Sequence, residues 1–584
     1  MNKIIHTLHT YTNKMGLSYE TKLLILSFVV GIIGGYGAIL FRFMIKGFHY
    51  AFTHETDALF GFMGHGYVIL IPAIGGLLVG VITTFFADEA KGHGVPEVMN
   101  AVLLKGGKIR PKVSVAKILA SAICIGSGGS AGREGPIVQI GSAFASTLGQ
   151  VLRLSDSMIK RLVAAGAAAG ISATFNAPIG GVIFGLEVIL GEYTATNFGT
   201  LVIAAVTAQF ITRIHLGNIH DFDLPQFTVV SPVEMVFYGI LGVLSAFVAV
   251  AFIKMLYKSE DLFNHIPHVP SWMLPAIGGL GVGLIGFFFP QVLGVGYDVM
   301  TSAIIGQYSV GLVLALVVIK LISTSLTLGS GGSGGIFSPS LFMGAMLGAG
   351  MGMLLHQWFP TMTATPGAYA IVGMAAVFAA GTRAPITAVL ILFEMTNTYE
   401  IILPLMVAVV IATYCAAKLK RDTLYTEKLS RRGINVFALK ERNNLDYMKV
   451  SDIMSSNGEI ISNRYNFSKM LDLIRNSSHS CFISVDDDGK LAGIVSLKDL
   501  RDAVFEKGMD HVILAQDLAT KDVLTVRPSD TLNDALKKFG TRDVELLPVV
   551  DSTAGGKVLG CVSRKNVISL YQDRVLNMRG KSIL

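Results

Sequence analysis

Charged side chains are scarce in this chain of 584 residues. Asp, Glu, Lys and Arg together make up 15% of it, against about a quarter in ordinary soluble proteins. The 62 residues from Leu321 to Thr382 contain none of the four. One membrane helix needs only ~20 apolar residues, so several membrane segments must lie within that stretch. The chain is therefore an integral membrane protein in contact with lipid, and a soluble enzyme is excluded.

Cysteine is also rare. The four cysteines show neither metal-ligand spacing nor a disulfide framework, and we expect them to be buried as small apolar residues: Cys124, Cys415, Cys481 and Cys561. No metal site is predicted, and no spacing of nucleophile and base indicates an enzyme. The first apolar run, residues 24–40, is long enough to remain as a membrane helix rather than act as a cleaved signal.

The net charge of +7 does not indicate a nucleic-acid partner. Its basic residues are not interleaved with aromatic ones but cluster at the ends of apolar runs, as in Lys418, Lys420, Arg421, Arg431 and Arg432. Such clusters are typical of cytoplasmic flanks. We therefore expect a multi-pass protein of the cell (plasma) membrane, with both termini and the C-terminal third in the cytoplasm.

The composition changes near residue 430. Before it the chain is apolar and rich in glycine, and after it short strand-like runs alternate with amphipathic helical patterns. This predicts a transmembrane domain followed by a linker and two α/β modules. The predicted bounds are 1–430 for the membrane domain, with halves at about 20–215 and 230–430, then 431–448 for the linker, 449–508 for the first module and 513–577 for the second.

The membrane domain contains an internal repeat. KILASAICIGSGGSAGREGP (117–136) aligns without gaps on KLISTSLTLGSGGSGGIFSP (320–339), and APIGGVIFGLE (177–187) matches APITAVLILFE (384–394). Two halves built on one plan place the substrate of a membrane transporter at the repeat interface, where broken helices present their N-termini to it.

Three glycine-flanked helix entries fit such a site: GHGVPE (92–97), GREGP (132–136) and GGIFSP (334–339). The first N–H groups of a helix lack intrahelical partners and carry a partial positive charge, so they attract an anion. A fixed cation would be costly in the membrane and would hold the ion too tightly. One such entry alone indicates close helix packing, but three together favour an anion site.

These motifs, with FNAP (175–178), LYTEKL (424–429) and the paired C-terminal modules, resemble the CLC family of chloride channels and proton/chloride exchangers. The resemblance covers essentially the whole chain. It implies an α-helical polytopic membrane protein with the CLC fold, two inverted repeats of broken, tilted helices, plus a cytoplasmic α/β CBS pair. It also implies a homodimer with one pathway per subunit for chloride, with bromide or nitrate as further candidates, and with protons as a second partner.

The resemblance assigns roles to individual residues. Glu134 would be the gate, because its ionised carboxylate is itself an anion that can take the place of chloride and leaves when protonated. We expect Arg133 to face the aqueous vestibule and raise the local anion concentration, since adjacent helical residues point about 100° apart. The amides of Ile336 and Phe337 and the hydroxyl of Tyr425 would coordinate the central and inner anion. The full anion-binding set is His93, Gly132, Arg133, Gly135, Ile336, Phe337 and Tyr425.

Two departures from the family pattern bear on mechanism. Exchangers typically carry a proton-relaying glutamate where this chain has Val188, which favours a passive channel; a proton-coupled antiporter stays the alternative, because some members exchange without that glutamate. Glu187 and its repeat mate Glu394 are expected to be structural. His93 stands where the family usually has serine, so either its ring donates one N–H to the anion or the ring turns aside and leaves coordination to backbone amides.

In the C-terminal modules, GIVSLKDL (493–500) and GCVSRKNV (560–567) share a pattern found in CBS pairs. Such residues contact the ribose and phosphates of an adenine nucleotide in some of these pairs, and in others the modules only strengthen dimer contacts. Both alternatives stay open here, and no other cofactor is expected. The candidate nucleotide-binding residues are Ser496, Asp499, Ser563 and Asn566.

Overall fold

The computed structural model describes residues 18–55, 66, 68–217, 230–436, 448–455, 460–477, 480–504, 513–542, 544–551 and 556–570. The chain separates into two compact units, Met1–Ile434 and Asn435–Leu584. We call them the membrane unit and the CBS unit and describe each by itself.

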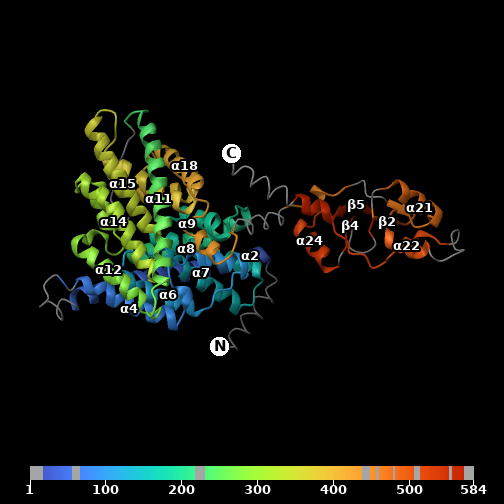
Figure 1. The fold of residues 1–584 in the computed structure, drawn as a ribbon, viewed down its shortest axis with the longest axis horizontal. Helices are drawn as coiled ribbons and strands as arrows, with labels where there is room; N and C mark the ends of the chain where they lie inside the picture. Colours follow the sequence, from blue (N-terminus) through green and yellow to red (C-terminus); the bar gives the residue numbers. More distant parts are fainter. Residues whose placement is uncertain are drawn as a thin grey trace. The chain divides into compact units, whose positions relative to one another are not determined.

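Helices make up the membrane unit (Figure 1). In chain order they form two series with corresponding members. The first half contains α2 (Tyr19–Tyr50), α4 (Leu70–Phe85), α5 (Val95–Leu104), α6 (Lys112–Gly126), α7 (Glu134–Val151), α8 (Asp156–Phe175), α9 (Pro178–Phe184) and α10 (Ala195–Leu216). The second half contains α11 (Glu234–Asn264), α12 (Leu274–Phe288), α13 (Tyr297–Ile304), α14 (Val310–Gly329), α15 (Phe337–Trp358), α16 (Pro366–Thr382), α17 (Pro385–Thr396) and α18 (Ile402–Leu419), and the short α19 (Thr426–Arg431) follows.

The helices differ in length because glycine and proline interrupt the apolar runs. Within the described residues, seven helices are long and apolar enough to cross a membrane. Others, such as α5 and α13, are too short to span ~30 Å of hydrocarbon. One end of each therefore lies at membrane depth, which is tolerated only where other segments or a polar cavity cover the free backbone groups.

The two halves meet through mirrored contacts between α4 and α12. Gly76 packs on the backbone of Pro275, and Gly279 packs in the same way on the backbone of Pro72, in both cases with no room for a Cβ. Such small-residue contacts let membrane helices approach closely. The two contacts are equivalent because the two halves are repeats of one another and pack face to face.

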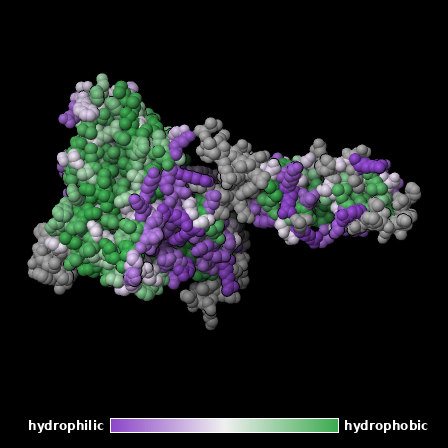
Figure 2. Space-filling view, viewed as in Figure 1, coloured by the Kyte–Doolittle hydropathy of each residue, from purple (hydrophilic) through white to green (hydrophobic). Residues whose placement is uncertain are grey.

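The outside of the membrane unit is apolar. Phe85, Phe210 and Phe288 are 69%, 64% and 68% exposed, and Figure 2 shows a broad hydrophobic face on this unit. An apolar surface of this extent marks an interaction surface rather than a water-facing one. Lipid covers it in a membrane protein.

The CBS unit is built from two small α/β modules. In the first module β1 runs parallel to β2, and β2 pairs antiparallel with β3; in the second module β4 and β5 form an antiparallel pair. Each sheet buries its own apolar cluster, around Phe482 and Val495 in the first and Leu547 and Val562 in the second. The elements are β1 (Ile460–Ser462), α21 (Phe467–Asn476), β2 (Cys481–Val485), β3 (Leu491–Ser496), α22 (Leu497–Val504), α23 (Ala515–Leu518), α24 (Leu532–Thr541), β4 (Leu546–Val550) and β5 (Val558–Ser563).

Candidate anion pathway

The three glycine-rich helix entries meet at the centre of the membrane unit. Gly132 donates to the carbonyl of Gly335 at 2.8 Å and accepts from its N–H at 2.6 Å. Gly92 donates to the carbonyl of Gly332 at 2.9 Å and accepts from the N–H of Gly334 at 3.3 Å. These four backbone bonds bring the N-termini of α5, α7 and α15 together, as the repeat analysis expects of a site at the interface of the halves.

Glycine is required here for two separate reasons. Gly94, the residue that caps α5, has φ +80°, a conformation that other residues rarely adopt. At Gly335 the limit is space, because a Cβ would stand 2.7 Å from the amide nitrogen of Gly135. The result is a set of three helix starts that lie close together.

Two buried lysines fix the turns that precede the short helices. Lys117 donates from Nζ to the carbonyls of Ala90 and Gly92, at 3.0 and 2.6 Å. Its repeat mate Lys320 donates to Val292 and Gly294, both at 2.9 Å. Both lysine side chains are fully buried, so backbone carbonyls replace water around each ammonium group.

Glu134 lies inside this convergence. It is the first residue of α7 and is fully buried. Its Oε1 accepts from the hydroxyl of Tyr297 at 2.7 Å, and its Oε2 accepts from the backbone N–H of Ser338 at 3.3 Å. The second bond comes from the first turn of α15, so the carboxylate occupies the place that an anion held by that helix would take.

The expectation that Arg133 turns away from Glu134 is wrong. Arg133 Nε lies 3.8 Å from Glu134 Oε1, and the arginine side chain is only 13% exposed. The helical separation of about 100° does not keep the two groups apart, because the long arginine side chain reaches back to the carboxylate although Arg133, the N-cap, has helical backbone angles. Its guanidinium carbon also lies 4.9 Å from the centre of the Tyr297 ring.

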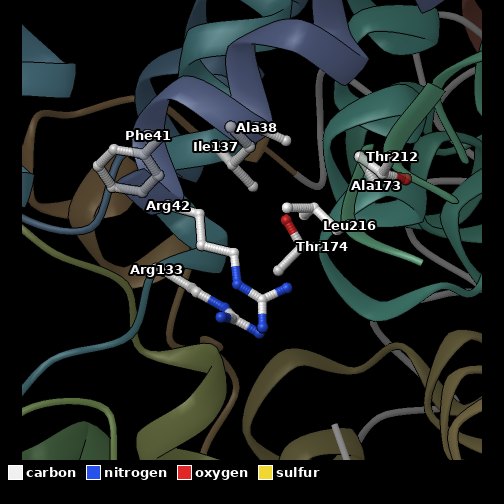
Figure 3. Close-up of a pocket in the computed structure, with 9 residues that line it drawn as sticks. All are labelled: Ala38, Phe41, Arg42, Arg133, Ile137, Ala173, Thr174, Thr212 and Leu216. Atoms are coloured by element: carbon white, nitrogen blue, oxygen red, sulfur yellow. The ribbon is translucent and has the colours of Figure 1, made fainter. Parts of the chain in front are cut away.

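Arg133 at the same time lines a small pocket of about 20 Å³ between α2, α7, α8 and α10. Figure 3 shows its guanidinium beside that of Arg42, which comes from α2. Thr174 of α8 and Thr212 of α10 also line it. The pocket thus brings two guanidinium groups together close to Glu134.

The His93 ring contacts the hydroxyl of Tyr257. Tyr257 donates its hydroxyl proton to the carbonyl of Leu424 at 2.8 Å, so the 3.2 Å contact between His93 Nε2 and the Tyr257 oxygen needs the proton on Nε2. The neutral ring then has no N–H left for an anion. Of the two alternatives open for His93, the geometry favours the ring turned aside.

The remaining residues of the predicted anion set lie at the same centre. Tyr425 is 2% exposed, and its ring centroid is 6.1 Å from that of His93. Ile336 caps α15 and Phe337 begins it. The Phe337 ring packs on Phe378, with centroids 4.0 Å apart, which fixes the start of α15 against α16.

Val188 and Glu187 lie in a π-helical turn, Gly185–Leu190. Val188 is 5% exposed. The Glu187 carboxylate accepts from the backbone N–H and hydroxyl of Thr387, at 2.8 and 2.6 Å, at the start of α17. Glu394 does the same for α9, accepting from Gly180 N–H at 2.6 Å. Each glutamate thus caps a helix of the other half, which agrees with the structural role expected for both.

Tyr297 and Ser338 are the site residues that the sequence analysis misses. A signal for Tyr297 is present: GVGYD (294–298) is the repeat counterpart of GHGVP (92–96), with the lysine-bound carbonyls of Gly294 and Gly92 in register. Only two glycines match, so the correspondence becomes clear once the lysine contacts are known.

The candidate nucleotide residues of the CBS unit make local helix caps. Ser496 donates from its backbone N–H and its hydroxyl to Asp499 Oδ2, at 2.8 and 2.6 Å, at the start of α22. In the second module the backbone N–H of Asn566 donates to Ser563 Oγ at 3.1 Å. A similar cap starts α24, where the Thr531 hydroxyl holds the pKa of Asp534 below its usual range.

Comparison with known families supports this architecture. Residues 75–417 match the model of the voltage gated chloride channel family, and residues 450–506 and 515–573 each match the CBS domain. The chain is 34% identical over 367 residues to a putative chloride channel protein ClcB-like of Ralstonia nicotianae, covering 62% of this chain and 85% of the relative. It is 33% identical over 427 residues to the H(+)/Cl(-) exchange transporter ClcA of Vibrio cholerae, covering 70% and 89%.

Solved structures of CLC proteins have the same fold as this chain. A slow cyanobacterial Cl-/H+ antiporter superimposes with a TM-score of 0.64 at 25% identity, over 73% of this chain and all of that one. A eukaryotic CLC transporter shares the fold over 94% of this chain and 98% of its own, with a TM-score of 0.61 at 21% identity. With its converging helix starts, its inverted halves and its two CBS domains, the chain belongs to the CLC family of voltage gated chloride channels and transporters.

Proposed function

We propose that this protein is a passive chloride channel whose gate is Glu134. One observation carries the choice of channel over exchanger. Val188 stands at the position from which a second glutamate would relay protons, and valine cannot bind a proton. Its neighbour Glu187 cannot substitute freely, because the start of α17 holds both of its oxygens.

The gate follows from where the Glu134 carboxylate lies. Ionised, it accepts the Ser338 N–H that a chloride ion would otherwise use, so carboxylate and chloride compete for one place. Protonated, it loses its charge and with it the attraction of the helix start. Flux should therefore rise as pH falls and as chloride rises.

Anion coordination in this proposal rests mainly on backbone N–H groups. The starts of α5, α7 and α15 supply them, with Tyr425 on the inner side. Such dipoles bind an anion without the tight grip of a fixed cation. Chloride is the substrate we propose, and the absence of a side-chain donor from neutral His93 leaves bromide and nitrate as competing anions to be measured.

A proton-coupled antiporter is the second candidate. It is favoured by relatives named as exchange transporters and by Glu134, a buried group that binds and releases protons in the channel proposal as well. The two candidates differ in one respect: an antiporter moves protons uphill when driven by chloride, and a channel does not.

We further propose a homodimer with one pathway per subunit, because the chain belongs to the CLC family and its own two halves together form one convergence of helix starts. We also propose that the protein lies in the plasma membrane with its CBS unit in the cytoplasm, because basic residues precede that unit.

For the CBS pair we propose a structural role rather than an adenine nucleotide site, since Ser496 and Asp499 bind each other.

The test of the channel proposal is chloride efflux from proteoliposomes, with external pH recorded in the same sample. Chloride efflux without sustained proton movement supports the channel. Proton uptake against its gradient that disappears in Glu134→Ala supports the antiporter instead. Val188→Thr is a matched control, because it changes the shape of the side chain little and adds no titratable group.

A further inference from the structure

We propose that the hydroxyl of Tyr297 is a latch on the gate: it holds the ionised Glu134 carboxylate in the anion site and so sets the pH at which the pathway opens. Tyr297 is a positioning residue in this account, acting through Glu134 rather than on the transported ion. The inference rests on the proposed role of Glu134 as the gate.

The contact between the two side chains is short and direct. Tyr297 donates from its hydroxyl to Glu134 Oε1 at 2.7 Å, while Ser338 N–H reaches the other oxygen at 3.3 Å. Hydrogen bonds from a hydroxyl to a carboxylate are stronger than neutral ones. The bond favours the ionised, blocking form of Glu134, because a protonated carboxyl is a weaker acceptor.

The backbone places the tyrosine firmly. Tyr297 is the first residue of α13, and the residue before it, Gly296, turns the chain with φ +87°. The carbonyl of Gly294 is fixed by the buried Lys320. The Tyr297 hydroxyl therefore approaches Glu134 from a helix start whose backbone is held in place.

Arg133 joins the pair as a third member. Its guanidinium carbon lies 4.9 Å from the Tyr297 ring centre, and its Nε lies 3.8 Å from Glu134 Oε1. A cation over the ring draws electron density from it, which makes the hydroxyl a better donor. The titratable or charged groups that face Glu134 are thus Arg133, Tyr297 of α13, and Tyr425 at the start of α19.

The internal repeat explains why the latch exists on one side only. Tyr297 corresponds to Val95, which begins α5 in the other half and has no hydroxyl. The half that carries the gate therefore lacks the donor, and the opposite half supplies it. The two aligned segments, GHGVP and GVGYD, therefore differ in whether they supply a hydroxyl at this position.

The experiment is chloride efflux from proteoliposomes containing the full chain, measured from pH 4 to 8. Tyr297→Phe removes only the hydroxyl. We expect the midpoint of the pH profile to move to higher pH by about one unit, which corresponds to a tenfold change in the protonation equilibrium, with the rate at low pH unchanged. Tyr369→Phe is the matched control, because it removes a buried hydroxyl that donates to a different carboxylate, Glu234, at 3.1 Å.

Two further variants test whether a shift in the pH midpoint comes from the hydrogen bond between Tyr297 and Glu134. A fluorinated tyrosine at 297, a stronger donor of nearly the same shape, should move the midpoint to lower pH, and it serves if the phenylalanine variant does not fold. In a Glu134→Gln background Tyr297→Phe should change nothing.

The latch is overturned if Tyr297→Phe follows the wild-type profile at every pH while Glu134→Gln is insensitive to pH. It is also overturned if Tyr297→Phe alters only the maximal rate. If Glu134→Gln itself keeps the full pH dependence, the proposed gate fails instead.

Discussion

Gly132 and Gly335 exchange both of their backbone hydrogen bonds, at 2.8 and 2.6 Å, although 203 positions separate them along the chain. Each belongs to the glycine-rich break of one repeat half. The pair therefore holds the start of α7, which carries Glu134, beside the start of α15, whose Ser338 N–H donates to the Glu134 carboxylate. The hydrogen bonds that join the two halves are therefore the same ones that position the site.

The contact around Gly335 leaves no room for a larger side chain. Gly335→Ala should destabilise the membrane unit by roughly 1–3 kcal/mol, the usual cost of an overpacked methyl, because its Cβ would lie 2.7 Å from the Gly135 nitrogen. Thermal unfolding of the purified protein measures this. Gly199→Ala in α10 is the control, since nothing lies within 4 Å of its added Cβ. Equal unfolding temperatures for the two variants would contradict the close contact.

Neutralising the gate should open the pathway. In Glu134→Gln the side chain keeps its size but loses the charge that competes with chloride. We expect chloride flux near pH 7.5 to rise at least about tenfold, equivalent to roughly 1.4 kcal/mol, and to become flat between pH 4.5 and 7.5. Glu20→Gln, on the exposed start of α2, should behave as wild type. A pH profile of normal steepness in Glu134→Gln would rule out this gate.

The paired helix caps predict symmetrical losses of stability. Glu187→Ala and Glu394→Ala each leave a helix start without its acceptor, at a cost of about 0.5–2 kcal/mol for an ordinary cap and more at the buried Thr387 and Gly180. We expect similar decreases in unfolding temperature, and no change in the number of protons moved per chloride. A change in that number for Glu187→Ala would assign it a proton-relay role.

Arg42 should assist anion entry. Because it lines the same pocket as Arg133, Arg42→Gln should raise the half-saturating external chloride concentration about two- to threefold with the maximal flux unchanged. The difference should shrink as an impermeant salt screens the charge. Arg213→Gln, at the exposed end of α10, provides the comparison. An effect on maximal flux alone would argue against an electrostatic role.

The CBS unit should not respond to nucleotide. Since Ser496 and Asp499 bind each other, ATP, ADP or AMP at millimolar concentration should leave its thermal unfolding unchanged. Asp499→Ala should lower the unfolding temperature through loss of the cap, with or without nucleotide. A rise in stability that saturates with one nucleotide and is lost in Asp499→Ala would restore the nucleotide site.

Much of this architecture was predictable because repeats and glycine breaks are local signals. The positions of Glu134 and Ile336 follow from aligning two stretches of sequence, and the helices begin where glycine and proline indicate. The CLC fold follows from the order of these motifs. The comparison with relatives confirms that family assignment.

The sequence does not reveal contacts that depend on how two helices far apart along the chain approach each other. Tyr297 reaches Glu134 only because α13 and α7 converge, and neither segment shows the other's position. The position of the Arg133 guanidinium is not predictable from helical spacing, because spacing fixes the direction of the Cβ atom and not the path of a long side chain. The tautomer of His93 likewise depends on Tyr257, which is 164 positions away.

The measurement that tests the central claim most directly is the reversal potential of the purified protein in a planar bilayer, with chloride and pH gradients set independently. A passive channel gated by Glu134 reverses at the chloride equilibrium potential, and a pH gradient changes the current without moving that potential. A reversal potential that shifts with the pH gradient at fixed chloride, and no longer shifts in Glu134→Ala, would show coupled exchange and contradict the account.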